Sequence, residues 1–412
     1  MKKKLILLVS MLFLTACFSI LFLNVRFSND LYPVVGARIR TAKALKAIDL
    51  MPEIEIEELP EFCETLIEEM HDYLEEHDFN GVALVAVGDQ VLLLNAYGLA
   101  NVEQEQPMKV DRKFQIASIS KPILAVSVMQ LVERDLLALD QTLDEFFPDL
   151  PRGDEMTIQQ LLTHTSGLFS GDDLTYYSMY TASNYLISYA FYRYEENDDE
   201  DNDDDEDEDD GNDEALDPIS LHGEPGDAIY SNLGFDLLGV IVEKASGMPY
   251  EQYIRQYIFD VAGMYYSGLN RAGEELEKLV TAYMGHIDYG IEAPIFHPSF
   301  GFASGGLHST AMDLFKFSRA LHHDLLISPE SYELMTSVHS EVWWVDHGFG
   351  WFINPRGSEN TVAHTGNLLG WHSILLRQQP EAITIVLLTN HGASYMGKAY
   401  TLLDLVLSEL AQ

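Results

Sequence analysis

The chain has 412 residues, with 24 basic and 66 acidic side chains and a formal net charge of −42. A surface this acidic repels a phosphate backbone and offers no basic stripe, which excludes nucleic-acid binding. The two cysteines, Cys17 and Cys63, are too few for a disulfide scaffold or a zinc site built from four thiolates. Apolar residues make up 47% of the sequence, which is normal for a protein that buries a sizeable core.

The first 26 residues have the form of an export signal. Three lysines follow the first methionine, and residues 5–25 are almost entirely apolar. This pattern predicts that the rest of the chain lies outside the cytoplasm, tethered to the bacterial cell membrane. Two interpretations of the tether stay open. Leu14-Thr15-Ala16-Cys17 resembles a lipoprotein box with a lipidated Cys17, and the whole run is long enough for an uncleaved membrane helix. A cleaved, secreted form is a third option, and residues 27–60 are expected to be a spacer.

The remaining chain, 61–412, predicts a single domain with strands near both ends. Val82–Val87 and Val91–Ala96 are joined at Gly88-Asp89, where a glycine at the first position of a two-residue turn fits a hairpin. Cys63 lies on the apolar side of the helix that precedes them, so a packed thiol is expected. The elements expected in chain order are a helix at 61–76, strands at 82–87, 91–96, 371–376 and 383–389, and a helix at 400–410.

The order of these elements predicts an α+β fold. Strands at both ends of the domain complete one antiparallel sheet flanked by helices, and a helical lobe is inserted at about 118–296. Within that lobe, 16 of the 20 positions in 195–214 are Asp or Glu. Like charges at this density resist compaction, so we expect a disordered, solvated insertion. Gly211 is out of register for a calcium-binding EF-hand loop, so no metal is expected there.

Ser118 and Lys121 form the first motif that could carry chemistry. The stretch that follows is apolar nearly all round as far as Glu133, which is typical of a buried central helix. Residues three apart share a helix face, so the lysine amine would lie beside the serine hydroxyl. A buried amine loses proton affinity and can accept the serine proton. The competing interpretation is a helix cap followed by a lysine that reaches solvent.

Tyr230-Ser231-Asn232 is the second motif. Asn232 is in the position to cap a helix at 233–245 that ends at Gly247. In the functional interpretation, this loop faces Ser118. The Tyr230 hydroxyl then relays a proton, and the Asn232 amide orients a substrate carbonyl.

His364-Thr365-Gly366 is the third motif and begins the last strand-rich stretch. We expect Gly366 to allow close backbone approach by a bound acyl group. The N–H of Asn367 would then point at a developing oxyanion together with the N–H of Ser118.

These three motifs in this order resemble the serine β-lactamase and penicillin-binding superfamily. The similarity is to the branch with class C β-lactamases, D,D-carboxypeptidases, D-aminopeptidases and related esterases, and it covers about 62–410. The resemblance implies a β-lactamase/transpeptidase-like fold and an acyl-enzyme on Ser118, with Lys121 and Tyr230 as the base system. It implies substrate contacts from Asn232 and from 364–367, a small peptide or ester as substrate, and no metal or organic cofactor. Supporting stretches lie at 114–117, 157–168, 239–247 and 301–310.

The chain also departs from the pattern of this family. His364 stands where its β-lactamases usually have lysine, and a neutral histidine attracts a substrate carboxylate less strongly. This favours D-amino-acid peptides or small esters over β-lactams as substrates. His164-Thr165-Ser166-Gly167 also matches the family, and we interpret it as a helix stop with Gly167 as the C-terminal cap. The alternative function is a catalytically idle scaffold or binding protein with the same fold. The oligomeric state cannot be predicted from these patterns.

Overall fold

The computed structural model describes residues 61–148, 150, 152–168, 223–271, 276–287, 290–293, 301–392 and 395–411. The chain divides into two units, Met1–Lys46 and Ala47–Gln412, and every described residue belongs to the second. The predicted export signal, spacer and acidic insertion therefore lie outside the described residues, as does the side chain of Cys63. Within the described ranges, no helix has the length and apolar character that a membrane crossing requires.

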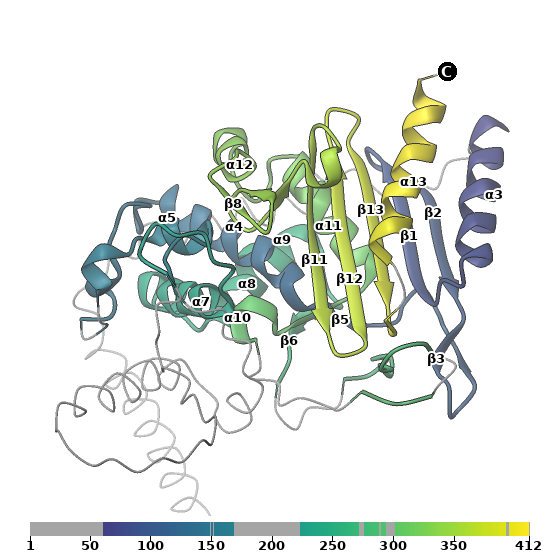
Figure 1. The fold of residues 1–412 in the computed structure, drawn as a ribbon, viewed down its shortest axis with the longest axis horizontal. Coiled ribbons are helices and arrows are strands. Elements are labelled where there is room, and N and C mark those ends of the chain that lie inside the picture. The colour runs from purple at the N-terminus through teal and green to yellow at the C-terminus, as the bar shows by residue number, and fades with distance from the viewer. Residues whose placement is uncertain are drawn as a thin grey trace, which may run out of the picture. The chain divides into compact units, whose positions relative to one another are not determined.

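An eight-stranded sheet with strand order β2-β1-β13-β12-β11-β10-β9-β8 occupies the centre of this unit (Figure 1). Each neighbouring pair is antiparallel, and β1 pairs with β13, so segments from both ends of the domain complete one sheet. This confirms the predicted antiparallel α+β architecture. The strands of the sheet are β1 (Gly81–Val87), β2 (Gln90–Tyr97), β8 (Ser340–Val342), β9 (Val345–His347), β10 (Phe352–Ile353), β11 (Thr361–Leu368), β12 (Trp371–Gln378) and β13 (Ile383–Thr389).

Two smaller sheets accompany the large one. β3 (Leu99–Asn101) pairs with β4 (Gln106–Pro107). β7 (Leu307–Ser309) pairs with both β5 (Phe114–Gln115) and β6 (Gly268–Leu269). Because β5 comes just before Ser118, this second sheet fixes the direction in which the chain enters the helical region.

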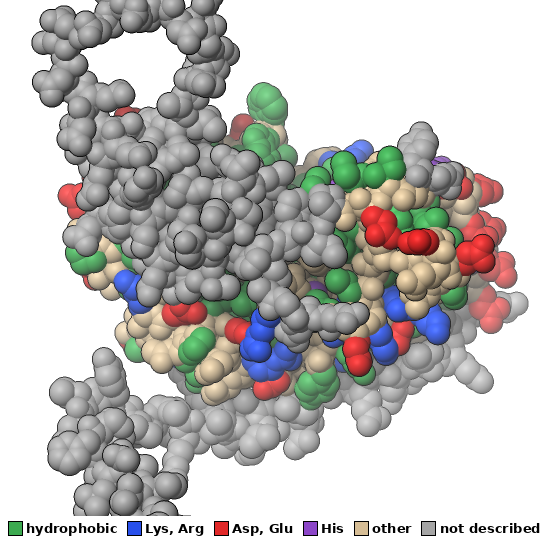
Figure 2. Space-filling view, turned by 90° about the horizontal axis from the view of Figure 1, so that it is seen from below, with side chains coloured by type: hydrophobic (Ala, Val, Ile, Leu, Met, Phe, Trp, Pro, Cys, Tyr) green, Lys and Arg blue, Asp and Glu red, His purple; other side chains and the backbone are tan. Residues whose placement is uncertain are grey.

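Helices α3 (Glu61–Glu76) and α13 (Tyr395–Leu410) cover one face of the large sheet (Figure 1). Leu66, Met70 and Leu74 recur every four residues along α3 and form one apolar stripe that packs into the core against the sheet. The acidic side chains of α3 from Glu64 to Glu76 are exposed, and acidic residues gather at this edge in Figure 2. The predicted helix at 61–76 is confirmed, and α13 begins five residues before its predicted start at Tyr400.

The opposite side of the sheet contacts α11 (Ala311–His322) and continues into the helical region. Its centre is α4 (Ser120–Val132), whose residues are buried from Ser120 to Leu131, as its apolar sequence predicts. The helices packed on α4 are α7 (Asn232–Ser246), α8 (Tyr250–Ile254) and α10 (Phe302–Gly305). The remaining helical segments are η1 (Ala117–Ile119), η2 (Leu143–Glu145), η3 (Gly153–Glu155), α5 (Ile158–Leu162), η4 (Arg255–Phe259), α9 (Asp260–Ala262), α12 (Pro329–Met335) and η6 (Pro355–Gly357).

The residue predicted to cap the N-terminus of α7 is wrong. Ser231, not Asn232, caps α7, because the Ser231 hydroxyl accepts a hydrogen bond from the Gly234 N–H at 2.9 Å. Asn232 is the first residue of the helix, so its amide is free to face inward. The other end of α7 is as predicted, with Gly247 in the left-handed region at φ +71°.

The prediction for Gly167 is also wrong. α5 ends at Leu162, with Thr163 as its C-cap, and Gly167 lies four residues beyond that cap. The glycine is still required at this position, since its φ is +73° and a Cβ would lie 2.6 Å from the Gly223 carbonyl oxygen. It allows two loops to approach closely and does not end the helix.

Candidate active site

Ser118 lies in the 3₁₀ turn η1, immediately before the buried helix α4. Ala117, the residue before it, has a φ of +45°, a region that non-glycine residues rarely occupy. Ser120 holds this strained turn, because its hydroxyl donates to the Ala117 carbonyl at 2.7 Å and accepts from the Leu307 N–H at 3.3 Å. Ser118 is partly exposed while its neighbours are buried, so a ligand can reach its hydroxyl.

Lys121 has no exposed surface, although lysine is among the residues that are least often buried. Its Nζ lies 3.0 Å from Ser118 Oγ, 2.6 Å from Asn232 Oδ1 and 3.0 Å from the Ser304 carbonyl oxygen. The three contacts come from η1, α7 and α10, so the amine joins three segments that are far apart in sequence. A lysine that extends to solvent, the competing interpretation, does not describe this residue.

Tyr230 completes the group around the amine. The residue is 8% exposed, and Lys121 Nζ lies 4.8 Å from the centroid of its ring. The structure therefore brings Ser118, Lys121, Tyr230 and Asn232 together, over a sequence separation of more than 100 residues.

Two aromatic rings stack on Tyr230. The His164 ring lies at 4.3 Å and the Trp343 ring at 4.8 Å between centroids. His164 Nδ1 also accepts a hydrogen bond from the Ser231 N–H at 3.0 Å, which ties the loop that carries Tyr230 to the end of α5. His164 was predicted to be structural and Trp343 was not predicted to be part of the site, since only the folded chain brings these rings together.

Trp343 reaches Tyr230 from a strained hairpin. Trp343 and Trp344 connect β8 to β9, and their φ angles are +54° and +62°. A two-residue turn with both φ angles positive normally contains Asn-Gly, because a bulky side chain is strained there. Trp343 stacks on Tyr230, while Trp344 is 89% exposed.

Three buried histidines surround this group: His164, His347 and His364. Burial holds the pKa of each below the usual histidine value, and the charge of Lys121 adds to this for His164 and His364. Within the described residues, the Nε2 atom of each ring has no hydrogen-bond partner. No group of three or more His, Cys, Asp or Glu residues in the described chain is arranged to hold a metal ion.

His364 and Gly366 lie within β11, and a neighbouring part of the chain approaches the glycine closely. A Cβ on Gly366 would lie 2.0 Å from the carbonyl oxygen of Ile116, which precedes the Ser118 turn. In the folded chain, the glycine is therefore needed for the close packing of β11 against the Ser118 turn. Ser373 of β12 donates to the same Ile116 carbonyl at 3.0 Å, so two strands hold the turn in place.

The side chains of Thr365 and Asn367 lie by α13. The Tyr395 hydroxyl donates to Asn367 Oδ1 at 2.7 Å. Burial raises the pKa of Tyr395, and the side chains of Asn367 and Thr365 partly oppose this increase. These side chains have partners within the protein, so the backbone is the part of β11 that could bind a substrate.

The backbone of β11 has an open edge beside η1. The N–H and carbonyl of Thr361 both face Asn354 next to β10, and the direction of these groups alternates along a strand. The N–H groups of Thr365 and Asn367 therefore point to the same edge. In the described chain, β10 pairs with β11 only at Val362 and Ala363, so this edge has no paired strand from His364 onward.

Asp236 is a supporting residue that the sequence analysis missed. Its Oδ1 accepts hydrogen bonds from the N–H groups of Ala303 and Ser304 at 3.1 and 2.8 Å. These bonds place the Ser304 carbonyl that Lys121 contacts. Burial raises the pKa of Asp236 to about 6, against the opposing effect of the backbone donors and Lys121. An aspartate four residues along a helix from Asn232 carries no sequence signal for this role.

The profile of the family described as Beta-lactamase matches residues 66–407. Penicillin-binding protein 4* of Bacillus subtilis is 29% identical over 339 residues, which cover 77% of this chain and 69% of that protein. Esterase EstB of Burkholderia gladioli is 30% identical over 362 residues, which cover 78% of this chain and 88% of that protein. The crystal structure of D-amino acid amidase from Ochrobactrum anthropi SV3 has a TM-score of 0.68 and 23% identity, with 85% of this chain and 98% of that chain covered.

The chain therefore belongs to the β-lactamase family, and the resemblance seen in its motifs is confirmed. Its relatives include penicillin-binding proteins and an esterase, and its fold is shared with an amidase. It is a serine hydrolase of the β-lactamase-related family.

Proposed function

We propose that this protein is an extracytoplasmic serine hydrolase that acts through an acyl-enzyme on D-amino-acid peptides or small esters. The observation that carries the proposal is the 3.0 Å contact between Lys121 Nζ and Ser118 Oγ, next to the ring of Tyr230. A nucleophilic hydroxyl within hydrogen-bond reach of a base that is itself held in place is the arrangement that covalent catalysis requires.

In the first step, Ser118 Oγ attacks the substrate carbonyl carbon, and the Lys121 amine accepts its proton as the general base. The amine keeps its contacts with Asn232 and the Ser304 carbonyl, so it stays oriented while its protonation changes. The tetrahedral oxygen accepts hydrogen bonds from the N–H groups of Ser118 and Asn367. Support for Asn367 comes from the open edge of β11 to which its N–H points.

In the second half of the reaction, the leaving amine or alcohol takes up a proton, and water then releases the acyl group. Tyr230 or Lys121 delivers the proton to the leaving group and receives one from the attacking water. His164 and Trp343 would act on these steps as positioning residues, since both rings stack on Tyr230.

The substrate class is proposed from the third motif and from the relatives. His364 is buried and its pKa is lowered, so it supplies no positive charge for a substrate carboxylate, and this disfavours a dedicated β-lactamase. The relatives are named a penicillin-binding protein and an esterase, and the fold neighbour an amidase, all of which fit acyl transfer from esters or amides. The extracytoplasmic location rests on the export signal at 1–26, with either lipidated Cys17 or an uncleaved helix as the membrane tether.

Acylation of Ser118 tests the function directly. The folded protein is incubated with a mixed panel of D-Ala-D-Ala peptides, esters and penicillins, and its intact mass is measured together with labelling by an active-site serine probe. Wild type is expected to gain the mass of one acyl group and to be labelled. Ser118→Ala is expected to do neither, with a loss of turnover of at least about 1,000-fold.

Ser127→Ala is the matched control, because Ser127 lies on α4, the helix that follows the Ser118 turn, and its hydroxyl donates to the Ile123 carbonyl within that helix. This variant should be labelled like wild type. Equal labelling of Ser118→Ala would remove Ser118 as the nucleophile. A folded wild-type protein that gains no mass and turns over no member of the panel would instead favour an idle scaffold or binding protein.

A further inference from the structure

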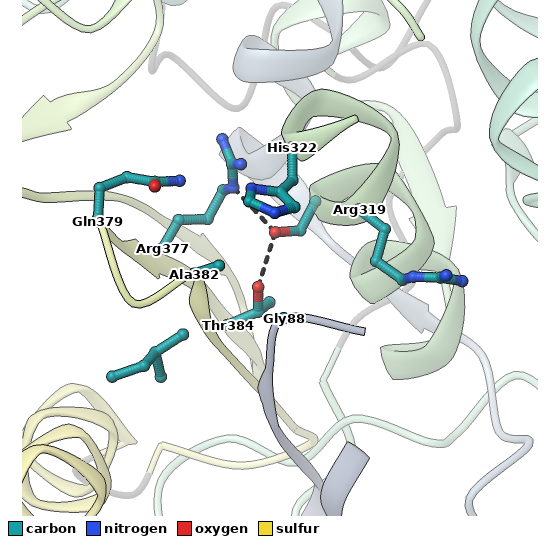
Figure 3. A pocket seen from close by; sticks show the side chains of 9 residues that line it. Gly88, Arg319, His322, Arg377, Gln379, Ala382 and Thr384 are labelled. Carbon is teal, nitrogen blue, oxygen red and sulfur yellow. Dashed lines mark hydrogen bonds between the residues drawn. The ribbon is translucent and has the colours of Figure 1, made fainter. Parts of the chain in front are cut away.

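A polar pocket lies at one end of the large sheet, away from the group around Ser118 (Figure 3). It is enclosed by the turn that follows β1, by α11, and by the end of β12 with the start of β13. None of its lining residues belongs to the group around Ser118, and it has room for about one water-sized particle. The pocket is lined by Gly88, Ser318, Arg319, His322, Arg377, Gln379, Ala382, Ile383 and Thr384.

Arg377 is the unusual residue of this pocket, since its side chain on β12 is only 2% exposed. Its Nε donates to Ser318 Oγ at 2.8 Å, and Ser318 also contacts Thr384 Oγ1 at 2.7 Å. Its Nη1 donates to the Tyr332 hydroxyl. These partners are neutral hydroxyls, and they use two of the five N–H donors of the guanidinium. Within the described chain, no carboxylate forms an ion pair with Arg377.

The neighbouring charges do not supply the missing counter-ion. Asp89 accepts from Arg319 Nε at 2.7 Å and also contacts His323 Nε2 at 2.8 Å, so this carboxylate is already paired with another arginine. In Figure 3, the guanidinium of Arg319 points away from that of Arg377, whereas the His322 ring lies beside Arg377. Burial lowers the pKa of Arg377. The pKa of His322 is also lowered, by burial and by the charges of His323 and Arg377, although Asp89 and Asp324 act in the opposite direction.

A buried charge without a counter-ion is strongly unfavourable, and proteins pair such charges or bind an ion to them. We propose that this pocket binds a small monovalent anion of the halide class, which serves as the counter-ion of Arg377. The unused N–H groups of the guanidinium donate to the anion, and the His322 ring lines the entrance. The small volume selects a single-atom anion over phosphate or sulfate, and the site is independent of the chemistry at Ser118.

Thermal unfolding in chloride tests the proposal. Sodium gluconate is replaced by sodium chloride from about 1 to about 200 mM at constant ionic strength, so that general screening does not change. The midpoint of wild type should rise by about 2–4 °C, because a ligand that binds only the folded state stabilises it. A crystal soaked in bromide should show anomalous density within hydrogen-bond distance of the Arg377 guanidinium.

Three variants separate this site from a general salt effect. Arg377→Met removes the charge, and His322→Glu places a carboxylate beside the guanidinium, so both should lose the chloride dependence. His322→Glu keeps Arg377 and its hydroxyl partners, so it remains informative if Arg377→Met fails to fold. Lys109→Gln removes an exposed positive charge elsewhere and should respond like wild type. A wild-type midpoint that does not depend on chloride, or an equal rise in every variant, would show that the pocket holds only water.

Discussion

Lys121 shows how a single residue organises this site. Removing an amine from water is costly, and the cost is offset here by three acceptors, the Ser118 hydroxyl, the Asn232 amide and the Ser304 carbonyl. Asp236 fixes the last of these through two backbone N–H groups. The arrangement keeps the amine within reach of the serine and prevents the long side chain from turning toward solvent.

Gly366 is a second residue on which the site depends. Because a Cβ there would meet the Ile116 carbonyl at 2.0 Å, Gly366→Ala forces β11 and the Ser118 turn apart. We expect a loss of about 1–3 kcal/mol in the free energy of unfolding, as for other overpacked sites. Turnover should fall by about 100-fold, since small displacements of catalytic groups are costly. Urea unfolding and steady-state kinetics measure the two effects.

Gly305→Ala is the matched control for this substitution. Gly305 is also close to the Ser118 turn, but a Cβ there would meet its nearest atom, the Ala117 carbonyl carbon, at an ordinary 3.6 Å. This variant should keep both stability and turnover. If both alanines behave alike, the close approach of β11 to the turn has no special role.

At the scale of elements, the β8–β9 hairpin combines strain with a contact to the site. Both tryptophans at its tip have positive φ angles, yet only Trp343 stacks on Tyr230. Strained backbone persists where the surrounding contacts maintain it, and such positions cluster at functional sites. The two residues can therefore be separated by mutation.

Trp344→Gly should stabilise the protein by about 1 kcal/mol, because glycine adopts a positive φ without the strain of a side chain. Turnover should not change, since Trp343 keeps its place. Trp343→Asn also suits the turn but removes the ring from Tyr230, so turnover should fall by about 10-fold, the equivalent of one aromatic contact. Thermal unfolding and kcat of the two variants make the comparison. Equal turnover in both would mean that the hairpin does not position Tyr230.

At the scale of the whole molecule, buried histidines link stability to pH. His164, His347, His364 and His308 all have a pKa below the usual value of 6.5, and burial is the main cause, with His308 at about 3. Below pH 6.5, the unfolded chain binds protons at these positions while the folded chain does not. Stability is therefore highest above this pH and falls as the pH decreases.

We expect the free energy of unfolding to decrease by about 1.4 kcal/mol per pH unit for each such histidine between pH 6.5 and about 5. His164→Asn should reduce this slope by the contribution of one histidine, because asparagine does not titrate in this range. Asparagine also tolerates the φ of +57° and can accept the hydrogen bond from the Ser231 N–H, so the fold should be kept. Urea unfolding at several pH values measures the slope. His77→Gln at an exposed position should leave it unchanged, and an unaltered slope in His164→Asn would contradict the assignment.

Local patterns were sufficient for much of the fold. The helix at 61–76, the hairpin at Gly88 and the paired strands β12 and β13 follow from periodicity and turn residues, because these signals act over a few positions. The caps were less predictable. Ser231 and Asn232 are both good capping residues, and only their geometry showed which one is the N-cap of α7.

The candidate site, like the fold, was predictable only in part. The three-residue spacing of Ser118 and Lys121 placed their side chains together, and the order of the three motifs identified the family. No sequence pattern predicted the contributions of Asp236, Trp343 and His347, or the burial of Arg377. Each of these depends on contacts between segments that are far apart in the chain.

By itself, the amino-acid sequence determined the elements and the family, and it predicted the nucleophile with its base, because helix spacing and strand alternation are short-range properties. Only the tertiary structure decided that Gly366 packs against the Ser118 turn, that two rings stack on Tyr230, and that a cation is buried with no carboxylate partner among the described residues. The physical reason is that packing and charge compensation depend on which side chains meet after folding, which a one-dimensional pattern does not specify.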